Sequence, residues 1–241
     1  MSYADNKRIA KNTIYLYIRT FVSMIVALYT SRKILEALGV EDFGIFNVVG
    51  GIISLMSFIN GSMSVATQRY LTYELGRGTE GQFNKVFNMA VYIHAIIAVI
   101  VLIAAETVGV WFVNTQLNIP EVRMGAANWV FQATILSALL GILQTPYNAA
   151  IVSHEHMHVY AYVGLGETFA KLFIVLGLFY YPYDRLAVWG FAFFFIQLCS
   201  SLIYRFYCIK KFTNCALKRN TWDSQLAKSM LGFTGWNMFG T

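Results

Sequence analysis

The chain has 241 residues, of which 57% are apolar or aromatic and 12% are charged, and its mean hydropathy is +0.54. A soluble globular domain of this composition would expose far too much apolar surface, so the composition excludes that class of protein. The net charge of +6 does not indicate a nucleic-acid-binding protein, because the basic residues flank apolar segments and form no patch on a soluble surface.

The apolar residues gather in blocks of about twenty, roughly the length that a helix needs to cross about 30 Å of hydrocarbon. Strands of a membrane barrel would be about ten residues long and strictly alternating. No small-residue cleavage site precedes the first block, so we expect it to be retained. The sequence predicts an all-α, polytopic membrane protein, a six-transmembrane-helix bundle with spans at 14–35, 43–66, 86–113, 126–150, 159–181 and 186–207.

A basic segment and then a short apolar one follow the sixth span. We expect residues 1–208 to form the six-helix transmembrane lobe and residues 209–228 to form a cytoplasmic basic linker. Residues 229–241 resemble the start of a seventh transmembrane helix, which is too short to cross a bilayer. The chain is therefore expected to be a fragment of a longer protein.

Lysine and arginine predict the orientation, since they remain preferentially on the cytoplasmic side of short loops. Loops on one side hold Arg32, Lys33, Arg123 and Arg185. We expect the other side, with the amino terminus, to face the cytoplasm in a bacterial inner membrane. That side holds twelve of the eighteen basic residues: Lys7, Arg8, Lys11, Arg69, Arg77, Lys85, Arg205, Lys210, Lys211, Lys218, Arg219 and Lys228.

Small and polar residues recur at helical spacing on three spans. Polar groups in hydrocarbon need a partner, so these stripes indicate which helix faces contact protein or water. Close helix packing through small residues is one interpretation, and a water-filled cavity shared by several spans is the other. The stripes are Thr20, Ser23, Ala27 and Thr30 on the first span, Gly50, Ser54, Ser57, Gly61, Ser64 and Gln68 on the second, and Thr134, Ser137, Gly141, Gln144 and Asn148 on the fourth.

Glu167 and Lys171 are four residues apart on the fifth span and share a helix face, with Lys171 about midway along the span. A charge at the bilayer centre costs roughly 2.5 to 3.5 kcal/mol on insertion scales, so we expect both to face the interior of the lobe. A self-neutralised ion pair and a polar cavity are both consistent with this pattern. Arg19, near the cytoplasmic end of the first span, either snorkels to the interface or joins Lys171 in a cationic lumen that attracts phosphate.

The histidines His154, His156 and His158 cluster with Glu155 in a short loop, but their alternating spacing lacks the helix-based ligand pair and third ligand of a metal site. The sequence contains no Gly-rich phosphate loop, nucleophile elbow or His-Glu-x-x-His helix. We therefore predict no metal site, no cofactor, no catalytic residues and no enzyme activity.

Five short segments carry a resemblance to a known family. They are Asn-Thr-Ile at 12–14, Ala-Leu-Gly-Val-Glu-Asp-Phe-Gly-Ile at 37–45, Thr-Pro-Tyr-Asn-Ala-Ala at 145–150, Ser-His-Glu-His-Met at 153–157 and Thr-Gly-Trp-Asn at 234–237. With them, the chain resembles the amino-terminal half of a polysaccharide biosynthesis and export protein, an O-antigen flippase-like member of the multidrug, oligosaccharidyl-lipid and polysaccharide exporter superfamily. Glu167 and Lys171 lie where such flippases often place an acidic and a basic residue.

The resemblance implies one lobe of a transporter with about twelve to fourteen helices in two lobes, which rock against each other to move substrate. The substrate would be a polyprenyl-diphosphate-linked oligosaccharide, flipped to the outer leaflet for surface polysaccharide, lipopolysaccharide or O-antigen assembly. The expected partners are this lipid-linked oligosaccharide, membrane lipids, a coupling ion (proton or Na⁺) and the missing carboxy-terminal lobe, with no nucleic acid.

Three alternatives remain open: a cation-coupled multidrug antiporter of the same superfamily, a membrane-embedded enzyme acting on lipid-linked sugars, and a structural membrane module. In the flippase interpretation, Arg19 and Lys171 would attract the diphosphate or sugar acids, and Glu167 would tune Lys171 or couple to an ion. The candidate substrate-binding residues are Arg19, Ser57, Asn60, Gln68, Gln144, Glu167 and Lys171.

Overall fold

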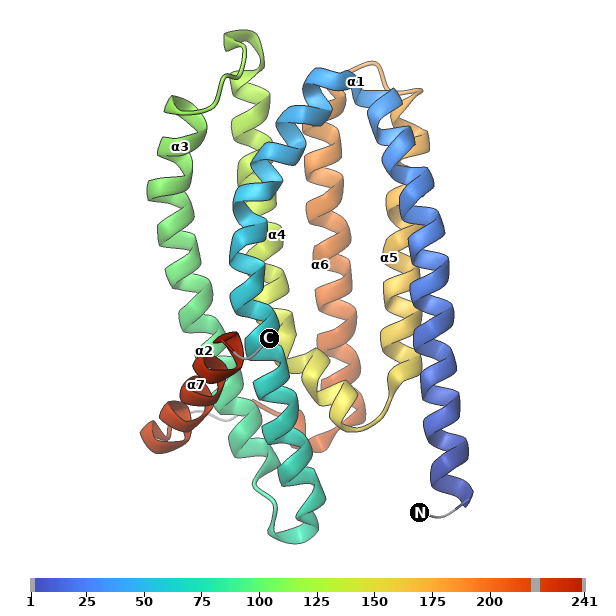
Figure 1. Cartoon of the computed structure of the whole chain (residues 1–241), viewed down its shortest axis with the longest axis vertical. Helices are drawn as coiled ribbons and strands as arrows, with labels where there is room; N and C mark the ends of the chain where they lie inside the picture. Colours follow the sequence, from blue (N-terminus) through green and yellow to red (C-terminus); the bar gives the residue numbers. More distant parts are fainter. Residues whose placement is uncertain (1–2, 218–221, 240–241) are drawn as a thin grey trace.

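The computed structural model describes the backbone of residues 3–217 and 222–239, and their side chains except those at 3–11, 52–59, 79, 238 and 239. Within these ranges the chain folds as a bundle of long helices without a strand (Figure 1). The bundle has two ends, which we name the amino-terminal end, where the first helix begins, and the Gly39 end, where that helix turns back (Figure 1).

The first helix, α1 (Tyr3–Gly76), consists of two arms, residues 3–38 and 40–76, which meet at Gly39. Gly39 has φ 79° and ψ 169°, a backbone conformation open to glycine because it lacks a Cβ. The arms run in opposite directions along the bundle (Figure 1). Arg185 donates a hydrogen bond of 3.0 Å from Nη1 to the carbonyl of Ala37, and so satisfies a carbonyl near the end of the first arm. The first two predicted spans are these arms.

The third span contains three consecutive segments, α2 (Phe83–Ala104), the π-helical turn η2 (Ala105–Gly109) and α3 (Val110–Thr115). A 3₁₀ turn, η1 (Gly78–Glu80), precedes it. The π-helical turn carries Glu106, whose carboxylate accepts a hydrogen bond of 3.1 Å from Nε2 of Gln132. An acidic side chain on a membrane-spanning segment thus has a polar partner on a neighbouring helix.

Three further helices complete the bundle: α4 (Glu121–Ser153), α5 (Met157–Leu178) and α6 (Arg185–Lys211). Their ends lie within five residues of the predicted spans. Five helical segments are long and apolar enough to cross a membrane when the described residues are searched, and the first of them, residues 12–51, extends past the Gly39 turn. The second arm of α1 makes the remaining passage along the bundle (Figure 1). The chain is a multi-pass, all-α membrane protein, as predicted.

The last helix, α7 (Ser224–Phe239), follows the 3₁₀ turn η3 (Thr213–Cys215) and lies obliquely across the lower part of α1 and α2 (Figure 1). Tyr70 and Ser229 share a hydrogen bond of 2.6 Å between their hydroxyls, and Lys85 pairs with Asp223 at 2.6 Å. The hydrogen bond from Lys85 holds the pKa of Asp223 below its usual value. Side-chain contacts thus fix the start of α7 against the amino-terminal end of the bundle.

The two largest of the four buried apolar clusters among the described residues hold the helices together towards opposite ends of the bundle. The larger lies towards the amino-terminal end and joins Phe87 of α2, Tyr204 of α6 and Met230 of α7. The other lies towards the Gly39 end and joins Val49 of α1 to Phe131 of α4. Because lipid tails are as apolar as these side chains, close packing contributes more to helix association in a membrane than a hydrophobic driving force does.

Replacing Gly190 with leucine is expected to destabilise the protein by about 2 kcal/mol, because overpacking a tight helix contact forces the backbones apart. A Cβ on Gly190 of α6 would lie 3.0 Å from Cγ2 and 3.3 Å from Cα of Val130 on α4. Thermal unfolding of the purified protein in detergent should show a fall in Tm of about 6 °C. Gly177→Leu is the matched control, since no atom lies within 4 Å of the equivalent Cβ position. Equal Tm values for the two variants would contradict the expectation.

Candidate functional site

Arg19 lies where the first arm of α1 packs against α5. Its guanidinium carbon is 4.3 Å from the centre of the Tyr160 ring, a cation–π contact. Gly164 lies one turn further along α5, and a Cβ atom at this residue would clash with the guanidinium. Glycine at 164 therefore leaves the space that the arginine fills. The side chain is directed onto α5, which is not the arrangement expected of an arginine that snorkels to the interface.

The guanidinium of Arg19 is incompletely satisfied. Its Nε is buried and has no hydrogen-bond partner among the described residues. One turn further towards the Gly39 end, the first arm of α1 contacts α5 again through Ser23 and Thr168, whose hydroxyls share a hydrogen bond of 3.2 Å. An arginine with an unused donor in a membrane-embedded contact is suited to bind an anion, because guanidinium groups form strong charge-assisted hydrogen bonds with phosphate.

Glu167 and Lys171 are held by different partners on α6. Ser200 donates a short hydrogen bond from its hydroxyl to Oε1 of Glu167. The ammonium nitrogen of Lys171 lies 4.8 Å from the centre of the Phe193 ring. The two charged groups do not form an ion pair with each other or with another described side chain. Of the two sequence-based interpretations, a self-neutralised pair therefore does not match the geometry.

Lys171 does not lie at the middle of its span, where the sequence analysis placed it. Since α5 covers Met157–Leu178, its midpoint falls at Glu167, and Lys171 lies one turn nearer the Gly39 end. Gly164, which contacts Arg19, is seven residues from Lys171, or about 10 Å along the helix axis. Tyr160, Gly164, Glu167 and Lys171 follow one another at steps of four, three and four, so they form one face of α5. Glu167 and Lys171 thus share this face, and Arg19 contacts the part of it formed by Tyr160 and Gly164.

The remaining candidates lie elsewhere. Gln144 is buried between α4 and α6, where its Oε1 accepts a hydrogen bond of 3.0 Å from Nε2 of Gln197. Asn60 accepts one of 2.9 Å from the hydroxyl of Thr145, and Gln68 accepts one from Ser153 through its backbone carbonyl. These contacts join α4 to the second arm of α1 and to α6. The side chain of Ser57 lies outside the described residues.

The structure contains an ion cluster at the Gly39 end that the sequence analysis did not predict. Arg123 of α4 donates to both carboxylate oxygens of Asp42, at 2.8 and 2.5 Å, and to both of Asp184, at 2.8 and 3.1 Å. Burial alone would raise the pKa of Asp184, but the hydrogen bond and charge of Arg123, together with hydrogen bonds from the backbone amides of Ala187 and Leu186, outweigh it, and the pKa lies below its usual value. One guanidinium thus ties the second arm of α1 to the starts of α4 and α6. In the sequence, each of the three residues is one charged residue at the edge of an apolar span, and nothing in its local pattern indicates a shared partner.

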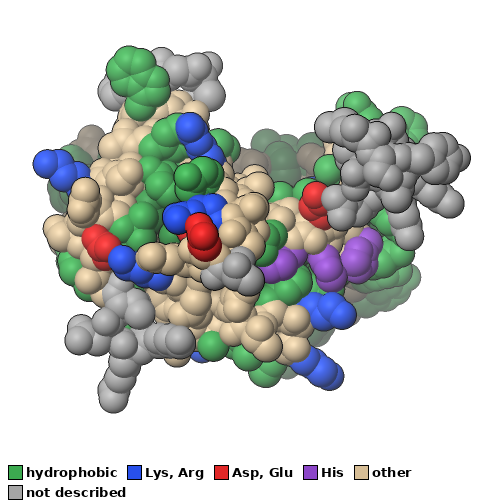
Figure 2. Space-filling view, turned by 90° about the horizontal axis from the view of Figure 1, so that it is seen from below, with side chains coloured by type: hydrophobic (Ala, Val, Ile, Leu, Met, Phe, Trp, Pro, Cys, Tyr) green, Lys and Arg blue, Asp and Glu red, His purple; other side chains and the backbone are tan. Residues whose placement is uncertain are grey.

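The histidine loop forms an aromatic cluster at the amino-terminal end. The rings of His154 and Phe212 stack with their centres 3.9 Å apart, and Nδ1 of His156 lies 2.7 Å from the hydroxyl of Tyr207. Figure 2 views this end and shows the histidines side by side, next to basic and apolar side chains. No group of three potential ligands suitable for a metal ion occurs within the described part of the chain. The histidines contribute ring contacts between the α4–α5 loop and the end of α6.

The protein is expected to lose some thermal stability as the pH falls below about 6.5, the ordinary pKa of histidine. Burial, followed by the positive charges of His158, His154 and Lys211, lowers the pKa of His156 in the folded protein. In that pH range the unfolded chain binds more protons than the folded one, so acid favours unfolding. His156→Gln should flatten the dependence of Tm on pH between 7.5 and 5.5. An unchanged slope in the variant would count against this role.

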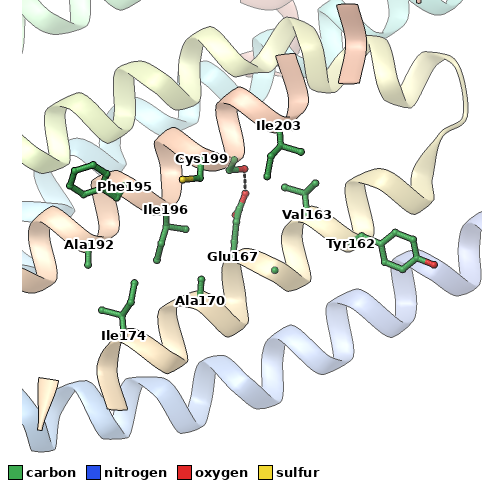
Figure 3. A pocket seen from close by; sticks show the side chains of 12 residues that line it. Tyr162, Val163, Glu167, Ala170, Ile174, Ala192, Phe195, Ile196, Cys199 and Ile203 are labelled. Atoms are coloured by element: carbon green, nitrogen blue, oxygen red, sulfur yellow. Dashed lines mark hydrogen bonds between the residues drawn. The ribbon is translucent and has the colours of Figure 1, made fainter. Parts of the chain in front are cut away.

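A second face of α5 borders a groove between α5 and α6. The groove has a volume of about 500 Å³, and its walls include Val163 and Ile174 of α5 and Phe195 and Ile203 of α6. Figure 3 shows Glu167 pointing from α5 across to α6, where the dashed line marks its hydrogen bond with Ser200. Glu167 thus lies between the face of α5 that contacts Arg19 and the apolar groove.

Comparison with known proteins gives a match in fold. No family model matches the chain, and no curated protein matches it. Its structure is similar to that of a multidrug resistance MATE family transporter of the MOP superfamily in the outward-facing conformation, with a TM-score of 0.79 and 11% sequence identity. The match covers 97% of this chain and 52% of the transporter, so the chain spans about half of its length. This membrane protein therefore has the fold of one lobe of a MATE transporter.

Proposed function

We propose that the chain is one lobe of a flippase that moves a polyprenyl-diphosphate-linked oligosaccharide across the bacterial inner membrane, for surface polysaccharide or O-antigen assembly. The observation that carries this proposal is the buried Nε of Arg19, which has no hydrogen-bond partner among the described residues and lies against the face of α5 that also holds Lys171. Two cations and one carboxylate give this face a net positive charge, which favours an anionic head group over a cationic drug. The MATE-like fold supports transport as the activity.

The proposal includes the arrangement of the whole transporter. A second lobe pairs with this one, and the substrate passes between the two as they rock against each other. The amino terminus faces the cytoplasm, in accordance with the excess of lysine and arginine at that end. Glu167 lies one turn from Lys171 and borders the groove between α5 and α6, and its carboxylate is of the type that binds a proton or Na⁺, so it is the candidate for ion coupling.

A multidrug antiporter is the second candidate function, because the structural neighbour is a multidrug resistance transporter and Glu167 borders an apolar groove. A carboxylate beside apolar walls is suited to an amphipathic cation. Under this alternative, Glu167 binds the drug and the two cations play no part in substrate recognition.

Lys171→Ala in the full-length protein is expected to slow flipping of a labelled lipid-linked oligosaccharide in proteoliposomes by about tenfold, because a charged hydrogen-bond donor is lost from the site. Drug efflux from the same vesicles should be absent in both proteins. Lys228→Ala is the matched control, since Lys228 is exposed on α7. Unchanged flipping and surface polysaccharide at normal expression would rule out the role of Lys171, and drug efflux that depends on Glu167 would favour the antiporter.

A further inference from the structure

The apolar groove between α5 and α6 continues towards the amino-terminal end of the bundle. Ile203 lines both this groove and a second one, also of about 500 Å³, whose other walls are Phe206, Tyr207, Lys210 and Lys211. The two grooves therefore meet at one residue of α6. From Ala192 at the far end to Lys210, they follow eighteen residues of helix, or about 27 Å.

The chemistry of the combined groove changes along its length. Around α5 its walls are apolar apart from Glu167, Ser200, the thiol of Cys199 and the hydroxyl of Tyr162. At the amino-terminal end the walls carry two lysines, Lys210 and Lys211, both exposed and neither in an ion pair with any described residue. One end is thus suited to an anion and the remainder to a hydrocarbon chain.

We propose that this groove is a binding site for an anionic membrane phospholipid, distinct from the contact that Arg19 of α1 makes with Tyr160 and Gly164 of α5. The phosphate lies between Lys210 and Lys211, at the level of the head groups, and one acyl chain lies along Phe206 and Ile203 towards Phe195. Charge complementarity selects the lipid, because each basic residue near an anionic membrane surface contributes about 1 kcal/mol. Glu167 repels a phosphate from the middle of the groove, so the head group is confined to the lysine end.

Phe206 provides most of the contact for the chain near the head group. It is 71% exposed in the isolated lobe, so it makes little contribution to the packing of the bundle. Tyr207, on the adjacent wall, is held in place by its hydroxyl contact with His156. An acyl chain that covers Phe206 would remove this aromatic surface from water and from less ordered lipid.

The test measures lipid bound to the purified protein by native mass spectrometry, after equilibration with phosphatidylglycerol or phosphatidylcholine. Lys210→Gln with Lys211→Gln should weaken phosphatidylglycerol binding roughly 30-fold and leave phosphatidylcholine binding unchanged. Phe206→Ala should weaken both about fivefold. Lys228→Gln, which alters an exposed lysine on α7 at the same end, should have no effect.

The altered side chains are exposed, so the variants should fold, which circular dichroism and size-exclusion chromatography check. Phosphatidylglycerol binding that is equal in the double variant and the wild type would overturn the proposal. Retention of undecaprenyl diphosphate in place of phosphatidylglycerol would also overturn it and would identify the groove as a substrate site. A second lobe that covers the groove would abolish binding by the full-length protein and count equally against it.

Discussion

Arg19→Ala is expected to weaken binding of a polyprenyl diphosphate to the full-length protein by about 10- to 100-fold, since a hydrogen bond between charged groups contributes about 1.5 to 3 kcal/mol. The substitution removes the guanidinium whose buried Nε has no hydrogen-bond partner within the described chain, along with its contact to Tyr160. Isothermal titration with the diphosphate, in detergent, measures the affinity. Flipping in proteoliposomes should fall with it.

Arg19→Lys separates charge from geometry. A lysine retains the positive charge but lacks the planar group that lies on Tyr160 and fills the space beside Gly164. We expect it to restore part of the affinity lost in the alanine variant. Arg32→Ala is the matched control, because Arg32 is exposed on the same arm and pairs with Glu36, which also pairs with Lys33. If Arg19→Ala bound the diphosphate as tightly as the wild type, the anion site would have to be placed elsewhere.

Arg123→Ala is expected to destabilise the protein by about 3 kcal/mol, because it leaves two carboxylates facing each other in a partly buried site. The side chains of Arg123 and Asp42 are 23% and 18% exposed, and Asp184 also caps α6. Thermal unfolding in detergent should show a fall in Tm of roughly 9 °C. Arg32→Ala, which breaks a more exposed pair with Glu36, should change Tm much less.

A charge-neutral variant distinguishes loss of the ion cluster from loss of packing. When Arg123→Met is combined with Asp42→Asn and Asp184→Asn, no charge remains unpaired, and asparagine at 184 still caps a helix. This triple variant should recover about half of the Tm lost by Arg123→Ala. If it unfolds at the same temperature as Arg123→Ala, the aliphatic part of the arginine, and not its charge, stabilises the Gly39 end.

The spans could be predicted because each depends on a continuous apolar block, a property of the local sequence. Positions within the blocks were harder to predict. Lys171 was expected at the middle of its span, but α5 ends at Leu178 and Glu167 occupies the midpoint. The seventh predicted segment, 229–241, falls within α7 as far as Phe239, although the helix begins earlier, at Ser224.

The contacts of the candidate site could not be predicted, because they join residues far apart in the chain. Spacing alone placed Glu167 and Lys171 on one face, but it could not show that each would take a different partner on α6. Gly164 has no side chain, and its part in accommodating Arg19 depends on a contact between helices. The ion cluster of Arg123 likewise requires three loop edges that only the folded bundle brings together.

Gly39 is the single non-helical residue of α1, and Arg19 lies twenty positions before it on a continuous helix. That distance is about 30 Å, and each residue turns the helix by about 100°. One residue inserted or deleted between the two positions would rotate Arg19 away from Tyr160 and Gly164 while leaving the apolar character of the arm unchanged. The number of residues between Arg19 and Gly39 therefore matters as much as the identity of Arg19 itself. The lipid-facing side chains of this arm, in contrast, can change as long as they remain apolar.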